Sequence, residues 1–141
     1  MRMRCRSILP GLASLALVGP GCSLHSLLDE LEDEQAKSAA ILCGCADIFP
    51  NTAECEALAG GTAFTARDRA CTEDALAIDR AASRDTLKCI LDVARRYNEC
   101  LEDMFECGRA DVACEGVFEE VEACPEVPAE VDSELSKCSA E

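Results

Sequence analysis

Large aromatic side chains are scarce in this chain: of 141 residues, none is Trp, one is Tyr and four are Phe. Such side chains contribute much of the apolar area that a folded domain buries. A domain that has few of them forms only a thin core. We therefore expect this protein to need a second source of stability besides the hydrophobic effect.

Histidine is also scarce, and His25, close to the start of the chain, is the only one. No Gly-x-Ser-x-Gly nucleophile motif, phosphate-binding glycine loop or twelve-residue calcium loop occurs anywhere. Paired carboxylates such as Glu102-Asp103 and Glu119-Glu120 are ordinary on a solvated helix face. We therefore expect no enzymatic activity, no cofactor and no metal site.

Basic residues are few, since 13 Lys and Arg stand against 28 Asp and Glu, which gives a net charge of −15. The most acidic part is the segment 98–141, whose only basic residues are Arg109 and Lys137. This charge argues against binding to nucleic acid or to anionic head groups. It is compatible with simple solubility, with loose cation binding, or with a basic protein partner on an acidic surface.

Long apolar runs are absent beyond the first twenty residues. Arg2, Arg4 and Arg6 precede an uncharged stretch at 7–18, and small residues follow at 19–21. This order is typical of a secretory signal peptide. The apolar stretch is shorter than the roughly 20 residues that span a bilayer. We predict that residues 1–21 are removed on export.

The end of this leader, Gly21-Cys22, resembles the signal peptides of bacterial lipoproteins. It departs from that family's pattern at Gly19, where Leu is usual, and at Pro20. The resemblance implies that Cys22 carries the lipid and that Ser23 is read for membrane sorting. It places the protein in the bacterial cell envelope, as an outer membrane lipoprotein that faces the periplasm or the surface. The alternative is ordinary cleavage, which would give a freely secreted protein.

Cysteine is the one abundant unusual residue, with 12 in the chain. Cys5 leaves with the leader, and lipidation occupies Cys22. An even set of ten then remains to form five disulfides, whereas ordinary cleavage leaves one thiol over. Disulfides persist in oxidising compartments, in agreement with export. The ten are Cys43, Cys45, Cys55, Cys71, Cys89, Cys100, Cys107, Cys114, Cys124 and Cys138.

Apolar residues recur at helical spacing, and no alternating run is long enough for a strand. We predict an all-α, small disulfide-stapled helical bundle. The lipidated N-terminus and a helical stalk occupy 22–40, and a cysteine-rich helical domain occupies 41–141. Helices are expected at 24–49, 52–59, about 70–81, 84–107, about 112–124 and about 129–138, with Gly108 capping the fourth.

The link at 108–110 is short, so that helices 84–107 and 112–124 should form an antiparallel hairpin. Phe118 is expected on the apolar face of the second helix. If cysteines at the same height on the two antiparallel helices are bonded, the disulfides are Cys107–Cys114 and Cys100–Cys124. The architecture resembles the coiled-coil–helix–coiled-coil–helix proteins, in which two helices are bonded inner to inner and outer to outer; no function follows from it.

A third bridge, Cys89–Cys138, would extend this ladder. Cys43, Cys45, Cys55 and Cys71 would then pair among themselves in an order that spacing does not reveal. Cys43 and Cys45 are two residues apart on a helix and point in different directions, so each should have a different partner.

The sequence favours an exported, lipid-anchored envelope protein that acts as a structural or binding module. The alternative is a periplasmic thiol-redox or metal-handling protein that uses Cys43 and Cys45. Reactive thiol pairs usually lie at a helix N-terminus, whereas this pair lies near a helix C-terminus.

Overall fold

The computed structural model describes residues 23–45, 51–59, 65–107 and 112–138. These segments form helices and contain no strand. In chain order the helices are α1 (Leu24–Leu42), α2 (Thr52–Ala59), α3 (Ala66–Leu76), α4 (Arg80–Met104), α5 (Val112–Phe118), the 3-10 helix η1 (Glu119–Ala123) and α6 (Ala129–Cys138). The predicted all-α, disulfide-rich bundle is thus confirmed.

Side-chain caps explain where two helices begin earlier than predicted. Thr65 caps α3 in a capping box with Asp68, which moves the start to Ala66. The Asp79 carboxylate accepts a hydrogen bond from the backbone N–H of Ala82 at 3.0 Å and starts α4 at Arg80.

The helix ends also differ from the predictions. α1 stops at Leu42 and not at 49, and α4 stops at Met104 because Phe105 is extended, with φ −73° and ψ 123°. The predicted Gly108 cap lies outside the described residues. The predicted helix 112–124 divides into α5 and η1.

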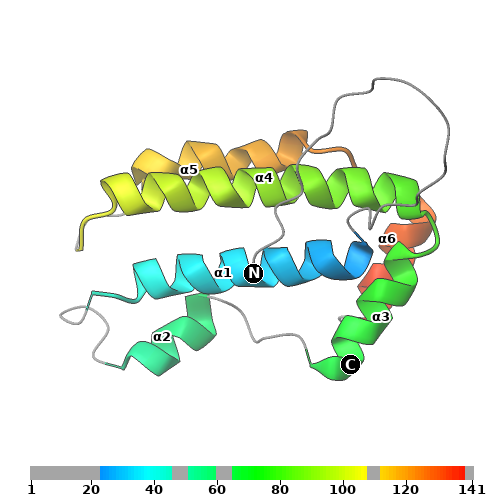
Figure 1. Cartoon of the computed structure of the whole chain (residues 1–141), viewed down its shortest axis with the longest axis horizontal. Helices are drawn as coiled ribbons and strands as arrows, with labels where there is room; N and C mark the ends of the chain where they lie inside the picture. Colours follow the sequence, from blue (N-terminus) through cyan, green and yellow to red (C-terminus); the bar gives the residue numbers. More distant parts are fainter. Residues whose placement is uncertain (1–22, 46–50, 60–64, 108–111, 139–141) are drawn as a thin grey trace, which may run out of the picture.

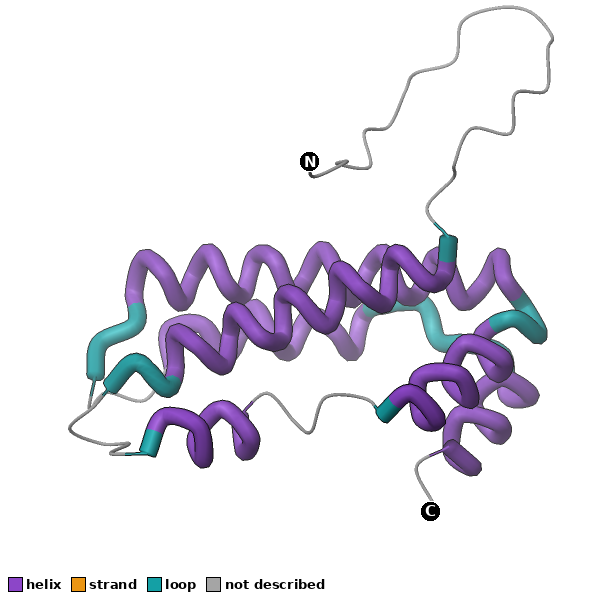
Figure 2. Tube along the Cα trace, turned by 60° about the horizontal axis from the view of Figure 1, so that its bottom comes forward, coloured by secondary structure: helices purple, strands orange, loops and turns teal. Residues whose placement is uncertain are grey.

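Three helices form the long axis of the bundle, with α4 between α1 and α5 (Figures 1 and 2). α1 and α4 run parallel: Arg95 meets Glu30, and seven residues further along each helix Lys37 meets Glu102. α5 runs antiparallel to α4, which confirms the predicted hairpin. α3 and α6 pack on each other at one end of the bundle (Figure 1).

A cluster of packed apolar residues lies at that same end, whereas Val93 and Leu101 are buried elsewhere on α4. α1, α4 and the α3–α6 pair meet at this cluster, and Val131 of α6 is fully buried. The cluster consists of Leu24, Leu27, Leu28, Leu76, Leu87, Leu91 and Val131. Three of these leucines belong to α1, so that α1 is part of the bundle and not the separate stalk predicted for 22–40. None of the helices described is long and apolar enough to cross a membrane.

Ten cysteines form five disulfides, and no described cysteine is free. The bridges are Cys43–Cys55, Cys45–Cys107, Cys71–Cys138, Cys89–Cys124 and Cys100–Cys114. The number of bridges among these ten cysteines agrees with the prediction, and two of the bridges join α4 to the α5–η1 segment.

The predicted partners within the hairpin are wrong. Neither Cys107–Cys114 nor Cys100–Cys124 nor Cys89–Cys138 forms. Because α4 ends at Met104, Cys107 lies beyond the helix and its place opposite Cys114 is taken by Cys100. Cys89 is eleven residues before Cys100 on the same face of α4, and it therefore meets Cys124.

The prediction that Cys43, Cys45, Cys55 and Cys71 pair among themselves is wrong. Cys43 bonds to Cys55, but Cys45 bonds to Cys107 and Cys71 to Cys138. Since α1 and α4 are parallel, their C-terminal ends lie at the same end of the bundle, which brings Cys45 to Cys107. The prediction that Cys43 and Cys45 have different partners is confirmed.

Candidate functional site

The predicted lipidation site, Cys22, lies outside the described residues, but its neighbour Ser23 is described. Ser23 is exposed and is the N-cap of α1, where its hydroxyl accepts a hydrogen bond from the backbone N–H of Ser26 at 3.1 Å. α1 therefore begins directly after Cys22. A lipid on Cys22 would be joined to the bundle without a long tether.

An ionic cluster joins the N-terminal half of α1 to α3. Arg69 of α3, whose side chain is 16% exposed, contacts Asp29 at 2.6 Å, Glu32 at 2.9 Å and Glu73 at 2.8 Å. It also donates to the backbone oxygen of His25 at 3.0 Å. Burial by itself would lower the pKa of Arg69, but the hydrogen bonds to the three carboxylates outweigh it and raise that pKa. Arg69 therefore stays charged and holds the two helices together.

Glu73 is the second centre of the cluster. Its carboxylate lies 2.6 Å from His25 Nδ1, and the hydrogen bonds from His25 and then from Arg69 lower the pKa of Glu73. His25, in the first turn of α1, thus serves as an exposed partner of the Asp29 and Glu73 carboxylates. A structural role for the cluster accounts for these contacts.

An exposed acidic surface follows α5 and η1. This acidic α5 face consists of Glu115, Phe118, Glu119, Glu120 and Glu122, all of them exposed. Phe118 is 59% exposed, and its ring lies 5.5 Å from that of Tyr97 on α4 at an interplanar angle of 60°. An aromatic pair with one open ring can receive an apolar or cationic group from another molecule.

A cation of α4 reaches this face. Arg96 of α4 contacts Glu120 at 2.6 Å, and the hydrogen bond to Glu120 raises the pKa of Arg96. Phe118, which is expected on the apolar face of the second helix, is thus largely exposed. α5 contacts α4 on one side, and the described residues place no helix over its other side, so that the apolar stripe of 112–124 is only partly covered.

The proposed reactive pair, Cys43 and Cys45, is not a dithiol. Both residues are buried, at 1% and 2% exposure, and each is oxidised with a different partner. Attack by one of these sulfurs on a substrate would first require reduction of a buried bridge. Among the residues that the structure describes, no three His, Cys, Asp or Glu side chains are grouped as metal ligands would be.

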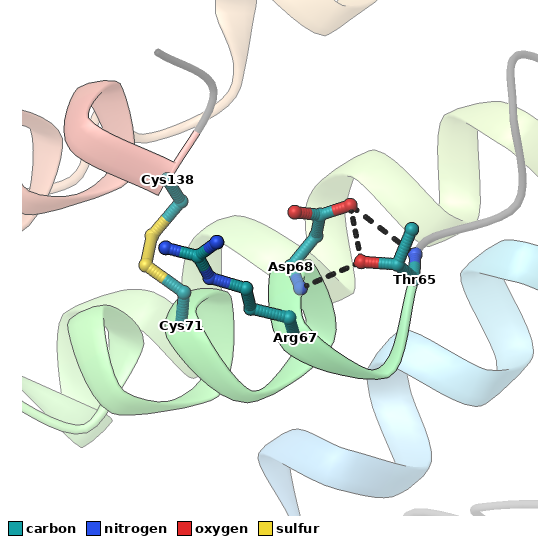
Figure 3. A pocket seen from close by; sticks show the side chains of 5 residues that line it. All are labelled: Thr65, Arg67, Asp68, Cys71 and Cys138. Carbon is teal, nitrogen blue, oxygen red and sulfur yellow. Dashed lines mark hydrogen bonds between the residues drawn. A yellow bond between two sulfur atoms is a disulfide. The ribbon is translucent and has the colours of Figure 1, made fainter. Parts of the chain in front are cut away.

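A hollow of about 310 Å³ lies between α3 and α6 (Figure 3). It is lined by Thr65, Arg67, Asp68, Cys71 and Cys138. The capping box uses two backbone N–H groups at the start of α3, since that of Thr65 donates to the Asp68 carboxylate and that of Asp68 donates to Thr65 Oγ1. No sequence pattern predicts this hollow, since its two walls are far apart in the chain.

Comparison with protein-family models, with curated proteins and with solved structures gives no match. The function is therefore inferred from the residues and their arrangement.

Proposed function

We propose that this protein is an exported, lipid-anchored module of the bacterial envelope that binds a protein partner through its acidic α5 face. The observation that supports the anchor best is the mutual pairing of ten cysteines in five disulfides. Such pairing is typical of proteins outside the cytoplasm, and none of these ten thiols is left to pair with Cys22.

The lipid also fits the placement of α1. Ser23 is the N-cap, and Leu24, Leu27 and Leu28 are in the core, so that α1 begins at the end of the bundle that holds the core. The anchor would thus be attached to the most firmly packed part of the protein. Sorting to the outer membrane rests on Ser23 and on the resemblance of the leader to lipoprotein signals.

Metabolic labelling tests the anchor. In a host that processes lipoproteins, labelled palmitate should be incorporated into the wild-type protein and completely lost in Cys22→Ala. The matched control is Cys5→Ala, which removes a leader cysteine and should keep the label. An unlabelled wild type, or label that survives Cys22→Ala, would show that the protein is secreted by ordinary cleavage.

The binding role is supported by an exposed aromatic ring among carboxylates. Burial of Phe118 by a partner would remove apolar area from water, while Glu115, Glu119 and Glu122 would attract basic groups at the rim. The partner expected from this chemistry is a basic polypeptide surface. No reaction is assigned to the site.

A photo-crosslinker can be placed beside this ring without disturbing the helix. Glu115 is exposed and lies three residues before Phe118, so that the two side chains share one face of α5. A photoreactive residue there should trap a partner in intact envelopes, and Phe118→Ala should reduce the yield roughly tenfold, as the loss of an aromatic anchor usually does. The same residue at exposed Ala81, at the opposite end of α4, is the control. Equal adducts at both positions, or a yield indifferent to Phe118→Ala, would contradict the proposed surface.

A further inference from the structure

One of the five disulfides differs from the others in its exposure. Each of the other four contains at least one cysteine that is no more than 9% exposed. These buried cysteines are Cys43, Cys45, Cys55, Cys114 and Cys124. In the bridge Cys71–Cys138, by contrast, both cysteines are half-buried. A thiol in solution can therefore approach this bridge more easily than the others.

The surroundings of Cys71–Cys138 are also open. The bridge forms one wall of the hollow between α3 and α6 that Figure 3 shows. Cys71 lines a second hollow further along the same two helices, together with Ala75, Ile78 and Lys137. Ile78 is 45% exposed, so that the second hollow offers an apolar contact beside the sulfur. A reductant can thus reach the bridge from two sides and has a surface on which to bind.

Positive charge lies next to these sulfurs on an otherwise acidic protein. The Arg67 side chain extends along the bridge in Figure 3, and Lys137 directly precedes Cys138. A nearby cation attracts an attacking thiolate and stabilises the thiolate that leaves, and both effects speed exchange. The carboxylates of Asp68, Asp74 and Glu134 line the same hollows. Glu134 pairs with Lys137, so that the effect assigned here is that of Arg67 alone.

The main competitor is Cys45–Cys107, because Cys107 is exposed. Attack on the Cys107 sulfur would expel Cys45, which is 2% exposed and so has little access to water. A buried thiolate is costly, because burial disfavours the charged form of the leaving sulfur. Exposure alone therefore does not make Cys45–Cys107 the more reactive bridge.

We propose that Cys71–Cys138 is a thiol–disulfide exchange site for a dithiol reductant. One thiolate of the reductant attacks a sulfur of the bridge, forms a mixed disulfide and displaces the other cysteine as a thiolate. The second thiolate of the reductant then attacks the mixed disulfide and releases the remaining cysteine. Two electrons pass to the protein, the reductant becomes a disulfide, and its two protons end on Cys71 and Cys138.

Opening this bridge would loosen α6 from α3 while α6 keeps its apolar contacts. Val131 would remain in the core cluster, with Val127 and Leu135 packed against it. The chain would also remain joined to α4 through Cys89–Cys124. The exchange therefore alters one end of the bundle and leaves the α1–α4–α5 layer closed by its own bridges.

Partial reduction of the oxidised mature protein tests the site. The protein is treated with limiting dithiothreitol, quenched in acid and alkylated, and the labelled cysteines are mapped by peptide mass spectrometry. Cys71 and Cys138 should be labelled together and at least fivefold faster than Cys45 and Cys107. Labelling of another pair first, or of all five pairs at one rate, would overturn the proposal.

The contribution of Arg67 has its own control. Arg67→Gln should slow the opening of Cys71–Cys138 several-fold, and added salt should reduce the difference from wild type. Arg80→Gln, which also removes one exposed arginine, should leave the rate unchanged. Circular dichroism establishes that both variants are folded before reduction. Equal rates for the two variants would overturn the role assigned to the charge.

Discussion

Complete reduction and alkylation of the mature protein should abolish its folded structure at room temperature. The far-ultraviolet circular dichroism of the helices should fall to a fraction of the oxidised value, and the cooperative thermal transition should disappear. The oxidised protein in the same buffer, alkylated without reduction, is the control.

The size of this effect follows from the small core. One cluster of seven buried apolar residues serves the helices at a single end of the bundle. Folded domains of this size are stable by about 5–15 kcal/mol, and a disulfide contributes about 2–4 kcal/mol. Five bridges at this value contribute about 10–20 kcal/mol, which is comparable to or larger than the whole free energy of unfolding. A reduced chain that stays compact and melts cooperatively would show that packing alone holds the bundle together.

The bridges should not contribute equally. Cys43–Cys55 closes a sequence separation of 12 residues, whereas Cys45–Cys107 closes one of 62. In the loop-entropy account their removal costs about 3 and about 4 kcal/mol respectively, because a longer loop restricts the unfolded chain more. The paired Cys→Ser variants provide an internal comparison for the reduction experiment.

Much of the fold could be predicted from sequence because it depends on local signals. The bounds of 52–59 and 129–138 match α2 and α6, and the short link after α4 correctly implies an antiparallel hairpin. The even number of cysteines gave the number of bridges. Each of these features depends on spacing, parity or residues within a few positions of one another.

The pairing of the cysteines could not be predicted, because it depends on contacts between distant segments. One local error, the end of α4 at Met104, moved Cys107 out of the hairpin and changed two of the predicted bridges. The parallel packing of α1 on α4 then determines the partner of Cys107. This packing could not be predicted, because no short loop connects α1 to α4. The polar composition of 29–40, which suggested a stalk, instead supplies ion pairs such as Lys37–Glu102 at 2.9 Å.

The candidate surfaces were predicted only in part. The acidity of 98–141 was evident, but the exposure of Phe118 depends on which elements cover α5. The hollow beside Cys71–Cys138 depends on the meeting of α3 and α6, whose cysteines are 67 residues apart. The exposure of a side chain depends on which distant segments pack against it, and these cannot be identified from a single sequence.

The packing of α1 on α4 depends on Asn98, and its replacement should be the most destabilising of the single polar changes. Asn98 is fully buried. Its amide nitrogen donates to the backbone oxygen of Glu34 at 2.9 Å and to the Glu34 carboxylate at 2.7 Å. Its amide oxygen accepts from the hydroxyl of Ser38 at 2.5 Å. One side chain of α4 thus satisfies three polar groups of α1.

Asn98→Ala should lower the free energy of unfolding by about 2–4 kcal/mol, because it leaves polar groups of α1 without their partner at a buried contact and opens a small cavity. Urea unfolding of the oxidised variants gives this value. Ser38→Ala is the matched control: it removes only one of the three hydrogen bonds and should cost about 1 kcal/mol. If Asn98→Ala lowers the free energy of unfolding no more than Ser38→Ala does, apolar contacts and disulfides hold α1 on α4. The hydrogen bonds of Asn98 then contribute little to stability.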